Sequence, residues 1–364
     1  MEPPHPTATG NLPNVQMVFL TARPALFAET LAHVRHGLPF IEEVVAICPE
    51  RTRDAVAAID DPALVVLTDE AITDAGDAGS VAGLDHTSRN YRLRTTMLEH
   101  DAIASQFVMA DDDNRPLRVL GPDIFVDDRG RYRNYWFYEL SRWRRTLTPM
   151  DQGLTNAMLV LQRHGIREPL AYASHMPQIM DRDLFREVAA TVADAGATYP
   201  LDEWSIYFNL ARHLHPDRFA PPERFVTLAW PQFPNEWQHQ VAPAAYEFEN
   251  HYPELYESGA LFDGLPTELR PERADADNLE KQRRWHELDI AVRNLEIPDS
   301  VTNPWTTGRP HRKLFFRGTK AMRKVVEYAT LDDRAAIAGL AGRIRALEDR
   351  LDGLEPPIDR PDNS

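Results

Sequence analysis

A short apolar run at residues 107–110 ends in three consecutive aspartates, Asp111, Asp112 and Asp113. The run has the length of a buried strand and is too short for an independent helix. Three carboxylates cannot be buried side by side without a counter-ion, because each loses its hydration and repels the others. We therefore expect them where a strand leaves its sheet, either around a divalent cation or in a solvated acidic turn. Oxygen ligands without cysteine favour Mg²⁺ or Mn²⁺.

The composition is that of a globular protein, and it excludes several classes of function. Of 364 residues, 43% are hydrophobic and 26% are charged, which allows a large core in one extended domain or in two domains. A net charge of −16 argues against a nucleic-acid partner. The single Cys48 excludes a disulfide framework and a cysteine metal site. Because the sequence has no membrane-spanning apolar run and no signal-like N-terminus, we expect a cytoplasmic protein.

The chain before the aspartates alternates between strand and helix patterns. Strands are expected at 15–21, 40–48 and 63–68, with helices at 24–36 and 51–59 between them. This order predicts a parallel, right-handed α/β sheet, and such sheets bind ligands at the carboxyl ends of their strands. The polar residues at those ends are Thr21, Arg23, Asp69 and the three aspartates.

A predicted loop at 70–88 leads into a helix at 88–101 that precedes the aspartate strand. Arg89, Arg92 and Arg94 lie near the predicted start of this helix, where cations are unfavourable for the helix dipole. Their position is understandable if an anion docks there, as anions do at helix N-termini. The alternative is a solvated basic face.

This strand–helix series resembles the GT-A nucleotide-sugar glycosyltransferases, with Thr21-x-Arg23 after the first strand and Phe-Val-Met-Ala-Asp-Asp-Asp after the arginine-bearing helix. The aspartate segment is most similar to the exostosin-like branch, and the likeness covers about residues 15–215. It implies an α/β fold of the GT-A type, a Rossmann-like mixed sheet flanked by helices. It also implies a DxD motif in which Asp111 and Asp113 hold Mn²⁺ or Mg²⁺ against a sugar-nucleotide diphosphate.

The same resemblance implies a binding site for a nucleotide-sugar donor. Its residues would come from the strand ends and the arginine helix: Thr21, Arg23, Asp69, Arg89, Arg94 and Asp112. The implied acceptor is a saccharide or a glycoconjugate.

The segment that follows the aspartates continues the pattern. Two apolar stretches at 118–127 and 131–140 flank Asp-Asp-Arg-Gly, a turn typical of a hairpin. A helix is expected at 151–164 and a strand at 170–175. The next helix is expected to begin at Ile179.

Two further stretches offer candidates for sugar binding and catalysis. The resemblance implies that His175, at a predicted strand end, reaches the donor sugar or the acceptor; the alternative is a structural histidine. The helix at 201–212 opens with Asp202 and Glu203, either as a favourable first turn or as the acidic pair of the glycosyltransferase fold. In the second interpretation Glu203, rather than Asp202, takes the proton of the acceptor hydroxyl. Trp204 supplies an apolar neighbour that would raise its pKa and could also contact the sugars.

Residues 219–265 are rich in proline and in aromatic side chains, which suit either stacking on sugar rings or a satellite of the core. Members of the GT-A fold often add a later histidine as a third metal ligand. His239 and His251 are the candidates for that ligand here.

The domain organisation follows from these segments. We expect a flexible tail at 1–14, a catalytic domain at 15–265, a helical and basic extension at 266–330, an oligomerisation helix at 331–357 and a disordered tail at 358–364. The extension and the oligomerisation helix together form a helical C-terminal addition to the fold.

Two C-terminal segments suggest further partners. Residues 309–324 carry basic but no acidic side chains, so they could meet a phosphate-rich ligand, the inner face of an anionic membrane, or the acidic catalytic domain. Residues 331–354 have apolar side chains at alternating three- and four-residue spacings, the seam of a coiled coil. We therefore expect a homo-oligomer, unless the seam lies along its own catalytic domain.

Three functions are compatible with the sequence. The leading one is a metal-dependent glycosyltransferase that uses a UDP- or GDP-sugar. The second is a sugar-phosphate transferase of the kind that makes bacterial capsules. The third is a noncatalytic scaffold that binds a nucleotide sugar.

Overall fold

The computed structural model describes residues 15–75, 81–142, 148–228, 246–258 and Arg283. The chain divides into two compact units, residues 1–282 and 283–364, and every element below belongs to the first. The predicted segments that lie outside the described residues are 1–14, 266–330 apart from Arg283, 331–357 and 358–364. Among the described helices, none is long and apolar enough to cross a bilayer.

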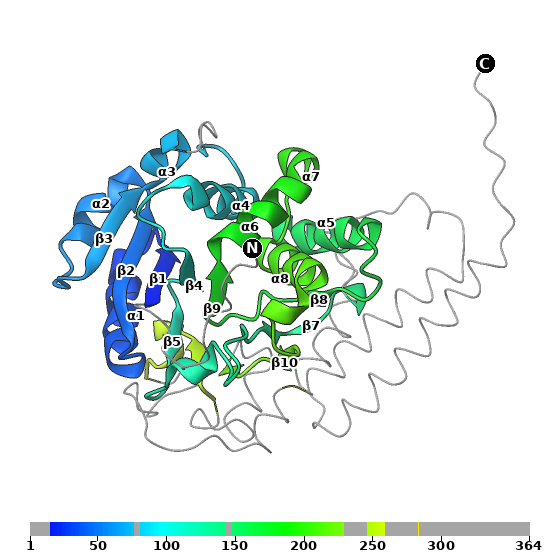
Figure 1. Cartoon of the computed structure of the whole chain (residues 1–364). Helices are drawn as coiled ribbons and strands as arrows, with labels where there is room; N and C mark the ends of the chain where they lie inside the picture. The colour runs from blue at the N-terminus through cyan, green and yellow to red at the C-terminus, as the bar shows by residue number, and fades with distance from the viewer. Residues whose placement is uncertain (1–14, 76–80, 143–147, 229–245, 259–282, 284–364) are drawn as a thin grey trace, which may run out of the picture. The chain divides into compact units, whose positions relative to one another are not determined.

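A five-stranded sheet forms the centre of the first unit (Figure 1). Its strands, in spatial order, are β3 (Leu64–Thr68), β2 (Ile41–Cys48), β1 (Val15–Leu20), β4 (Gln106–Asp111) and β9 (Gln178–Asp181). The first four strands are parallel, and β9 runs antiparallel to β4. The predicted α/β fold with a mixed sheet flanked by helices is therefore confirmed.

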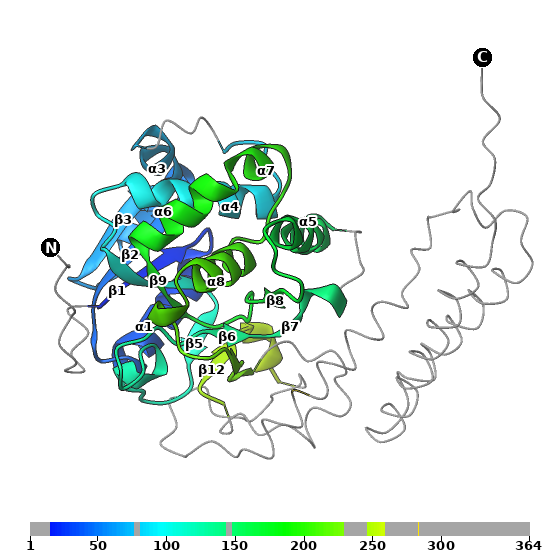
Figure 2. The same cartoon turned by 45° about the vertical axis from the view of Figure 1, so that its right-hand side comes forward.

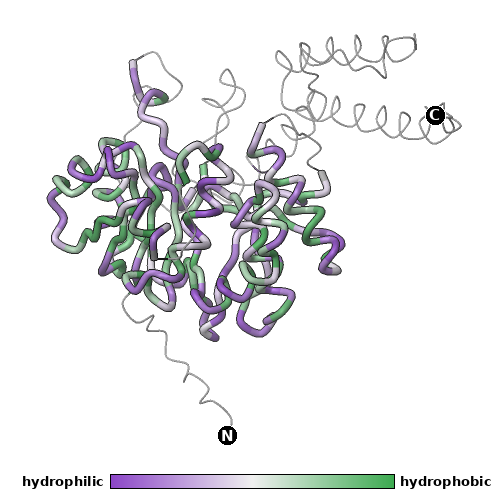
Figure 3. Tube along the Cα trace, turned by 90° about the horizontal axis from the view of Figure 1, so that it is seen from above, coloured by the Kyte–Doolittle hydropathy of each residue, from purple (hydrophilic) through white to green (hydrophobic). Residues whose placement is uncertain are grey.

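Helices connect the strands and cover both faces of the sheet. They are α1 (Pro24–Gly37), α2 (Glu50–Ala57), α3 (Asp69–Ala75), α4 (His86–Thr96), α5 (Pro149–Arg163), α6 (Arg182–Thr191), α7 (Ala193–Thr198) and α8 (Glu203–Leu214). Right-handed crossovers place α1 and α2 on one face, and the return from β3 to β4 uses the other. Helices α4, α6 and α8 group on that second face (Figure 2). The central strands are consequently apolar and buried, whereas hydrophilic residues follow the outer turns (Figure 3).

Several helices begin at a side chain that accepts a backbone hydrogen bond, which satisfies an N–H group left free at the helix start. These caps are Asp85 for α4, Thr148 for α5, Asp181 for α6 and Asp202 for α8. The cap at Asp202 fixes the start of α8, whose first residue is Glu203.

The aspartates lie where the central sheet meets a second one. Strand β4 ends at Asp111, and β5 (Asn114–Pro116) begins three residues later, after Asp112 and Asp113. Strand β5 pairs antiparallel with β12 (Phe248–Asn250), and β11 (Thr227–Leu228) completes this second sheet. The link between β4 and β5 is therefore held at both ends, as expected for residues that must present carboxylates in a fixed geometry.

Three local predictions are wrong. The beginning of the predicted loop at 70–88 belongs to α3, which starts directly after β3 with two acidic residues in its first turn. The predicted helix start at Ile179 lies inside β9, because the edge of β4 offers backbone partners that no local pattern reveals. The predicted strand at 170–175 is reduced to β8 (Leu170–Ala171), since side chains rather than a second strand bind the rest of it.

The predicted hairpin is only partly present. Its turn forms around Gly130, which has a φ of +76° and supplies the left-handed backbone that the turn needs. The flanking segments, however, share only an isolated bridge. They pair with distant partners instead: β6 (Tyr135–Trp136) with β10 (Glu223–Arg224), and β7 (Tyr138–Glu139) with β8.

Candidate active site

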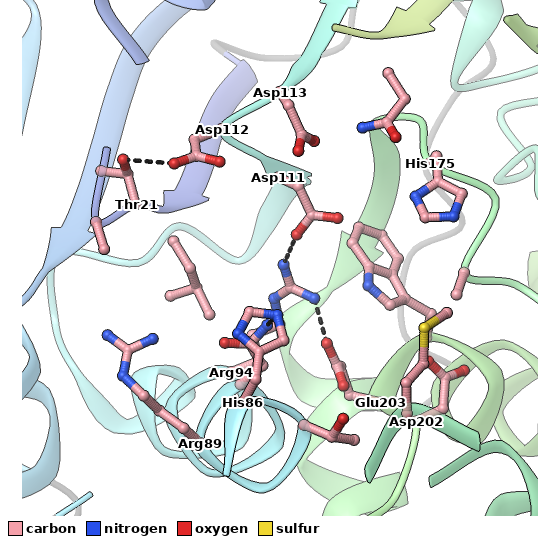
Figure 4. A pocket seen from close by; sticks show the side chains of 18 of the residues that line it. Thr21, His86, Arg89, Arg94, Asp111, Asp112, Asp113, His175, Asp202 and Glu203 are labelled. Atoms are coloured by element: carbon pink, nitrogen blue, oxygen red, sulfur yellow. Dashed lines mark hydrogen bonds and ion pairs between the residues drawn. The ribbon is translucent and has the colours of Figure 1, made fainter. Parts of the chain in front are cut away.

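A pocket of about 520 Å³ lies at the carboxyl ends of β1 and β4 (Figure 4). Its walls come from the turn after β1, one face of α4, the aspartates, the segment after β8 and the start of α8. The predicted site residues that line it are Thr21, Arg23, Arg89, Arg94, Asp111, Asp112, Asp113, His175, Asp202, Glu203 and Trp204. The fold thus brings residues from distant parts of the chain into one cavity, whose volume suits a small organic ligand.

Asp112 is fixed by the protein itself. Its buried carboxylate accepts a hydrogen bond from the Thr21 hydroxyl at 2.8 Å (Figure 4). It also forms an ion pair with Arg23. The Thr30 hydroxyl donates to the backbone carbonyl of Asp112 at 2.7 Å. These contacts tie the end of β4 to β1 and α1 and hold the half-exposed Arg23 in the pocket wall. Asp112 lines the pocket while it contacts Thr21 and Arg23, and its contact with a donor stays a prediction.

Asp111 and Asp113 have different surroundings. Asp113 accepts hydrogen bonds from Arg23 at 2.8 Å and from Asn114 at 3.0 Å, yet burial and the charge of Asp111 raise its pKa to about 7. Burial also opposes ionisation of Asp111, but the ion pair with Arg94 outweighs it and lowers the pKa of that carboxyl. Asp111 is the most accessible of the three aspartates, with 35% of its side chain exposed. A cation placed here would relieve the repulsion between the two carboxylates.

The aspartates supply the oxygen ligands that a hard cation prefers, but they do not form a complete metal-binding site by themselves. Within the described residues, no three His, Cys, Asp or Glu side chains converge on one point. Mg²⁺ keeps water molecules and takes phosphate oxygens alongside one or two carboxylates, and Asp111 and Asp113 match that mode of binding. The residues present are therefore compatible with a metal that binds together with a phosphate-bearing ligand.

Arg94 is the buried cation at the centre of the site. Its guanidinium donates hydrogen bonds to Asp111 and Glu203 (Figure 4) and lies 4.8 Å from the centroid of the Trp204 ring. The predicted position of this arginine near a helix start is wrong. Helix α4 begins at His86, so Arg94 falls in the last turn, where a cation suits the helix dipole. Its positive charge is shared by two carboxylates, those of Asp111 and Glu203.

Arg89 lies in the first half of α4 and also reaches the pocket. Its guanidinium donates to Asp69 at 2.6 Å. Asp69, the first residue of α3, does not line the pocket, so its predicted direct contact with a donor is wrong and it acts by orienting Arg89. Arg92, on the same helix, lies outside the pocket wall.

The two acidic residues at the start of α8, Asp202 and Glu203, have different surroundings. Asp202 accepts a hydrogen bond from the Ser205 backbone N–H at 2.8 Å and caps the helix, and burial raises its pKa. Glu203 is buried, and burial raises its pKa to about 7 although Arg94 opposes the shift. The charge of the neighbouring Asp202 carboxylate acts in the same direction as burial and also raises the pKa of Glu203.

His175 and Trp204 form the wall opposite the first strand. His175 has a φ of +52°, and its imidazole packs edge-on against Phe137 with ring centroids 5.8 Å apart. Trp204 is 5% exposed and covers Arg94. Both residues line the pocket, as expected from their sequence context.

The predicted metal role of His251 is wrong. Its imidazole is buried next to the buried Glu249, with Nε2 at 3.2 Å from a carboxylate oxygen of the exposed Glu29, and burial lowers its pKa to about 3. Its neighbours Asn250 and Tyr252 line the pocket instead, because successive side chains of extended backbone point in opposite directions. The His251 backbone N–H still donates to the Asp113 carbonyl at 2.6 Å. His239 lies outside the described residues.

Sequence reasoning missed part of the pocket wall. The missed residues are Leu20, Ala22, His86, Thr87, Asn90, Met150, Ala173, Met176, Asn250 and Tyr252. His86 and Asn90 precede Arg94 at four-residue spacing on α4, so helical periodicity could have identified them. Asn250 and Tyr252 lie in a segment where the sequence carries no comparable pattern.

No family model and no curated protein sequence matches the chain. Solved structures with a similar arrangement include the galactosyltransferase LgtC in complex with donor and acceptor sugar analogues, with 13% identity, a TM-score of 0.39 and coverage of 78% of this chain and 98% of that one. Mouse xyloside xylosyltransferase 1 has 10% identity, a TM-score of 0.37 and coverage of 66% and 98%. The 4-diphosphocytidyl-2C-methyl-D-erythritol synthase of Anaerococcus prevotii has 10% identity, a TM-score of 0.28 and coverage of 58% and 86%. Because these TM-scores are low, the function proposed below rests on the residues of the site.

Proposed function

We propose that the chain is a metal-dependent glycosyltransferase that moves a sugar from a UDP- or GDP-sugar onto a saccharide or glycoconjugate acceptor. One observation carries this proposal: a single pocket combines the three aspartates at the end of β4, three arginines and a buried acid, Glu203, with a pKa near neutrality. Each of these groups has a use when a sugar leaves a nucleoside diphosphate.

The diphosphate of the donor would lie between the aspartates and the arginines. Asp111 and Asp113 would hold Mg²⁺ or Mn²⁺, which when bound neutralises charge on the leaving diphosphate. Arg23 and Arg89 line the same pocket with part of each side chain exposed, so they can donate charge-assisted hydrogen bonds to phosphate oxygens. Their carboxylate partners, Asp112 and Asp69, keep both guanidinium groups oriented before the ligand arrives.

Glu203 is the proposed proton acceptor for the hydroxyl that attacks the sugar. A pKa of about 7 leaves this carboxyl partly ionised at neutral pH, the range in which a general base is most effective. Asp202 supports this role as the cap that fixes the start of α8. His175 and Trp204 complete the proposed sugar-binding wall, with aromatic faces suited to a pyranose ring.

Incubation with a panel of nucleotide sugars, Mn²⁺ and saccharide acceptors tests the proposal. We expect release of UDP or GDP and transfer of the sugar, with the Asp111→Ala variant inactive. Release of UMP or CMP would indicate sugar-phosphate transfer instead. If no nucleotide raises the melting temperature with or without Mn²⁺, the pocket does not bind nucleotides and the proposal fails.

Two accessory roles rest on the sequence alone. The basic segment 309–324 is proposed to contact an anionic surface such as the inner face of a membrane. The segment 331–354 is proposed to join copies of the chain into a homo-oligomer.

A further inference from the structure

His175 is the only non-glycine residue in the described part of the chain with a positive φ, at +52°. A residue with a Cβ atom adopts this conformation at an energetic cost, and such residues persist where the surrounding structure forces them. The imidazole lies in the pocket wall, with its edge against Phe137. A neighbouring group must therefore hold the His175 backbone in this conformation.

Sheet topology explains why this segment lies next to the aspartates. Strand β9 runs antiparallel to β4, with Gln178 opposite Met109, two residues before Asp111. The residues that enter β9 therefore lie beside the residues that leave β4. His175, three residues before Gln178, is carried to the aspartate end of the sheet by this pairing (Figure 4).

Gln178 holds the segment that leads into His175. Its buried amide N–H group donates to the Tyr172 carbonyl at 2.8 Å and to the Ser174 hydroxyl at 3.1 Å. Its amide oxygen accepts from the Tyr135 backbone N–H at 2.8 Å. One fully buried side chain thus connects the turn before His175 to β9 and to β6.

The turn between Tyr172 and Ser174 is tight. The Ser174 N–H donates to the Tyr172 carbonyl at 2.7 Å, across only two residues. The Tyr172 carbonyl therefore accepts from both Ser174 and Gln178, while the Tyr172 N–H is bound by the Ser205 hydroxyl of α8 at 3.0 Å. Side chains therefore hold this backbone in place of a strand partner, and of the two that bond the Tyr172 backbone, Gln178 and Ser205, Gln178 is the nearer to His175 in sequence.

We propose that Gln178 is a positioning residue that holds the 172–176 segment in the conformation that projects His175 toward the donor. The contact between His175 and substrate rests on the proposed function; the role of Gln178 in setting the His175 backbone does not. Gln178 does not line the pocket, so it acts on a ligand through the 172–176 segment, in which Ala173, His175 and Met176 line the pocket, and its effect on turnover is assigned to His175.

A glycine–alanine comparison at position 175 measures the strain directly. Both variants remove the imidazole, but alanine is disfavoured at positive φ, whereas at ordinary φ glycine is the less stable residue. We expect His175→Gly to melt about 2–4 °C above His175→Ala. If the alanine variant melts at or above the glycine variant, the backbone is not strained in solution and the proposal fails.

The same comparison in a Gln178→Met background tests the holding role. If Gln178 imposes the conformation, the advantage of glycine disappears or reverses once the hydrogen bonds are lost. Gln16→Met is the matched control, because Gln16 is a buried glutamine of β1 that also bonds backbone groups, at Ala102 and Ala104. The control should keep the glycine advantage. An unchanged advantage with Gln178→Met, or its loss in the control as well, overturns the proposal.

A milder variant serves if Gln178→Met does not fold. Ser174→Ala removes only one acceptor of the Gln178 amide, so it should reduce the glycine advantage without abolishing it. A full glycine advantage in the Ser174→Ala background would then count against the role of Gln178.

The rate of sugar transfer provides a second test of the role of Gln178. Gln178→Met should reduce sugar transfer by about 10- to 100-fold, the range that a misplaced contact can cost. In a His175→Ala background it should cause no further loss, because both changes remove the same contact. A further loss of similar size would show that Gln178 acts elsewhere. If no nucleotide sugar is turned over by the unaltered protein, the proposed function fails, while the melting comparison still decides the role of Gln178.

Discussion

Arg94 and Glu203 form an ion pair in which both side chains are almost completely buried, with 1% and 5% of their surface exposed. The two residues are 109 positions apart in the chain. Arg94 also binds Asp111, so it connects the end of β4 to the start of α8. The buried cation is therefore a structural centre of the pocket as well as a determinant of its charge.

Replacing Arg94 should destabilise the fold strongly. In Arg94→Met the carboxylates of Asp111 and Glu203 lose their shared counter-ion, and we expect the free energy of unfolding to fall by about 3–5 kcal/mol at pH 7.5. The double variant with Glu203→Gln should recover part of this loss, because fewer buried charges are left unpaired. Urea denaturation measures both effects. Arg53→Met, which breaks an exposed pair with Glu50, is the control and should cost about 0–1 kcal/mol.

The raised pKa of Glu203 predicts a dependence of stability on pH. In the unfolded chain the carboxyl releases its proton near its ordinary pKa of 4.5, whereas in the fold it does so at about 7. The folded state therefore holds more protons between these values, and the free energy of unfolding should decrease as the pH rises from about 4.5 to 7. Asp113 contributes in the same direction. Urea denaturation across this range should show a shallower decrease for Glu203→Gln, and parallel curves would contradict the raised pKa.

Replacing Asp113 should affect metal binding and folding stability in different ways. Asp113→Asn removes a buried carboxylate that Asp111 repels, so at pH 8 and without metal we expect the variant to be as stable as the parent or more stable. It should nevertheless lose the rise in melting temperature that Mn²⁺ produces together with UDP or GDP. Asp101→Asn, at an exposed position, is the control and should keep the full rise. A full Mn²⁺-dependent rise in Asp113→Asn would remove this residue from the metal site.

Replacing Arg89 should weaken the binding of a nucleoside diphosphate but not the binding of a nucleoside. Because its proposed contacts are charge-assisted hydrogen bonds to phosphate oxygens, Arg89→Ala should weaken binding of UDP or GDP by about 1.5–3 kcal/mol and leave uridine or guanosine nearly unaffected. Isothermal titration calorimetry measures both ligands. Arg92→Ala, on the same helix but outside the pocket wall, should change neither affinity. Equal losses for nucleoside and diphosphate would contradict the assignment.

Residues 331–354 should determine the oligomeric state of the chain. If residues 331–354 form a coiled-coil seam, the full chain is a homo-oligomer, whereas a chain ending at residue 330 is a monomer that still folds. Light scattering at micromolar concentration measures the mass of both. A monomeric full-length chain would contradict the prediction.

The sequence by itself determined the first half of the sheet and the place of the aspartates. Strands β1, β2 and β3 are apolar runs between clear helix signals such as Pro24, so local periodicity was enough to identify them. The end of β4 followed from the change from apolar residues to Asp111. Consecutive carboxylates need cationic partners when they are buried, so they are expected after a strand rather than within it, and here Arg23 supplies the partner for Asp112 and Asp113.

Only the tertiary structure decided how distant residues combine. Strand β9 was missed because its pairing with β4 is nonlocal, and the role of Gln178 depends on that pairing. The partners of Arg94 could not be read from α4, since Glu203 comes from another helix. His251 is turned away from the pocket because the register of extended backbone gives its neighbours the inward positions. Charge, hydrogen bonding and side-chain direction in the site are set by contacts across the chain, and local sequence patterns do not encode them.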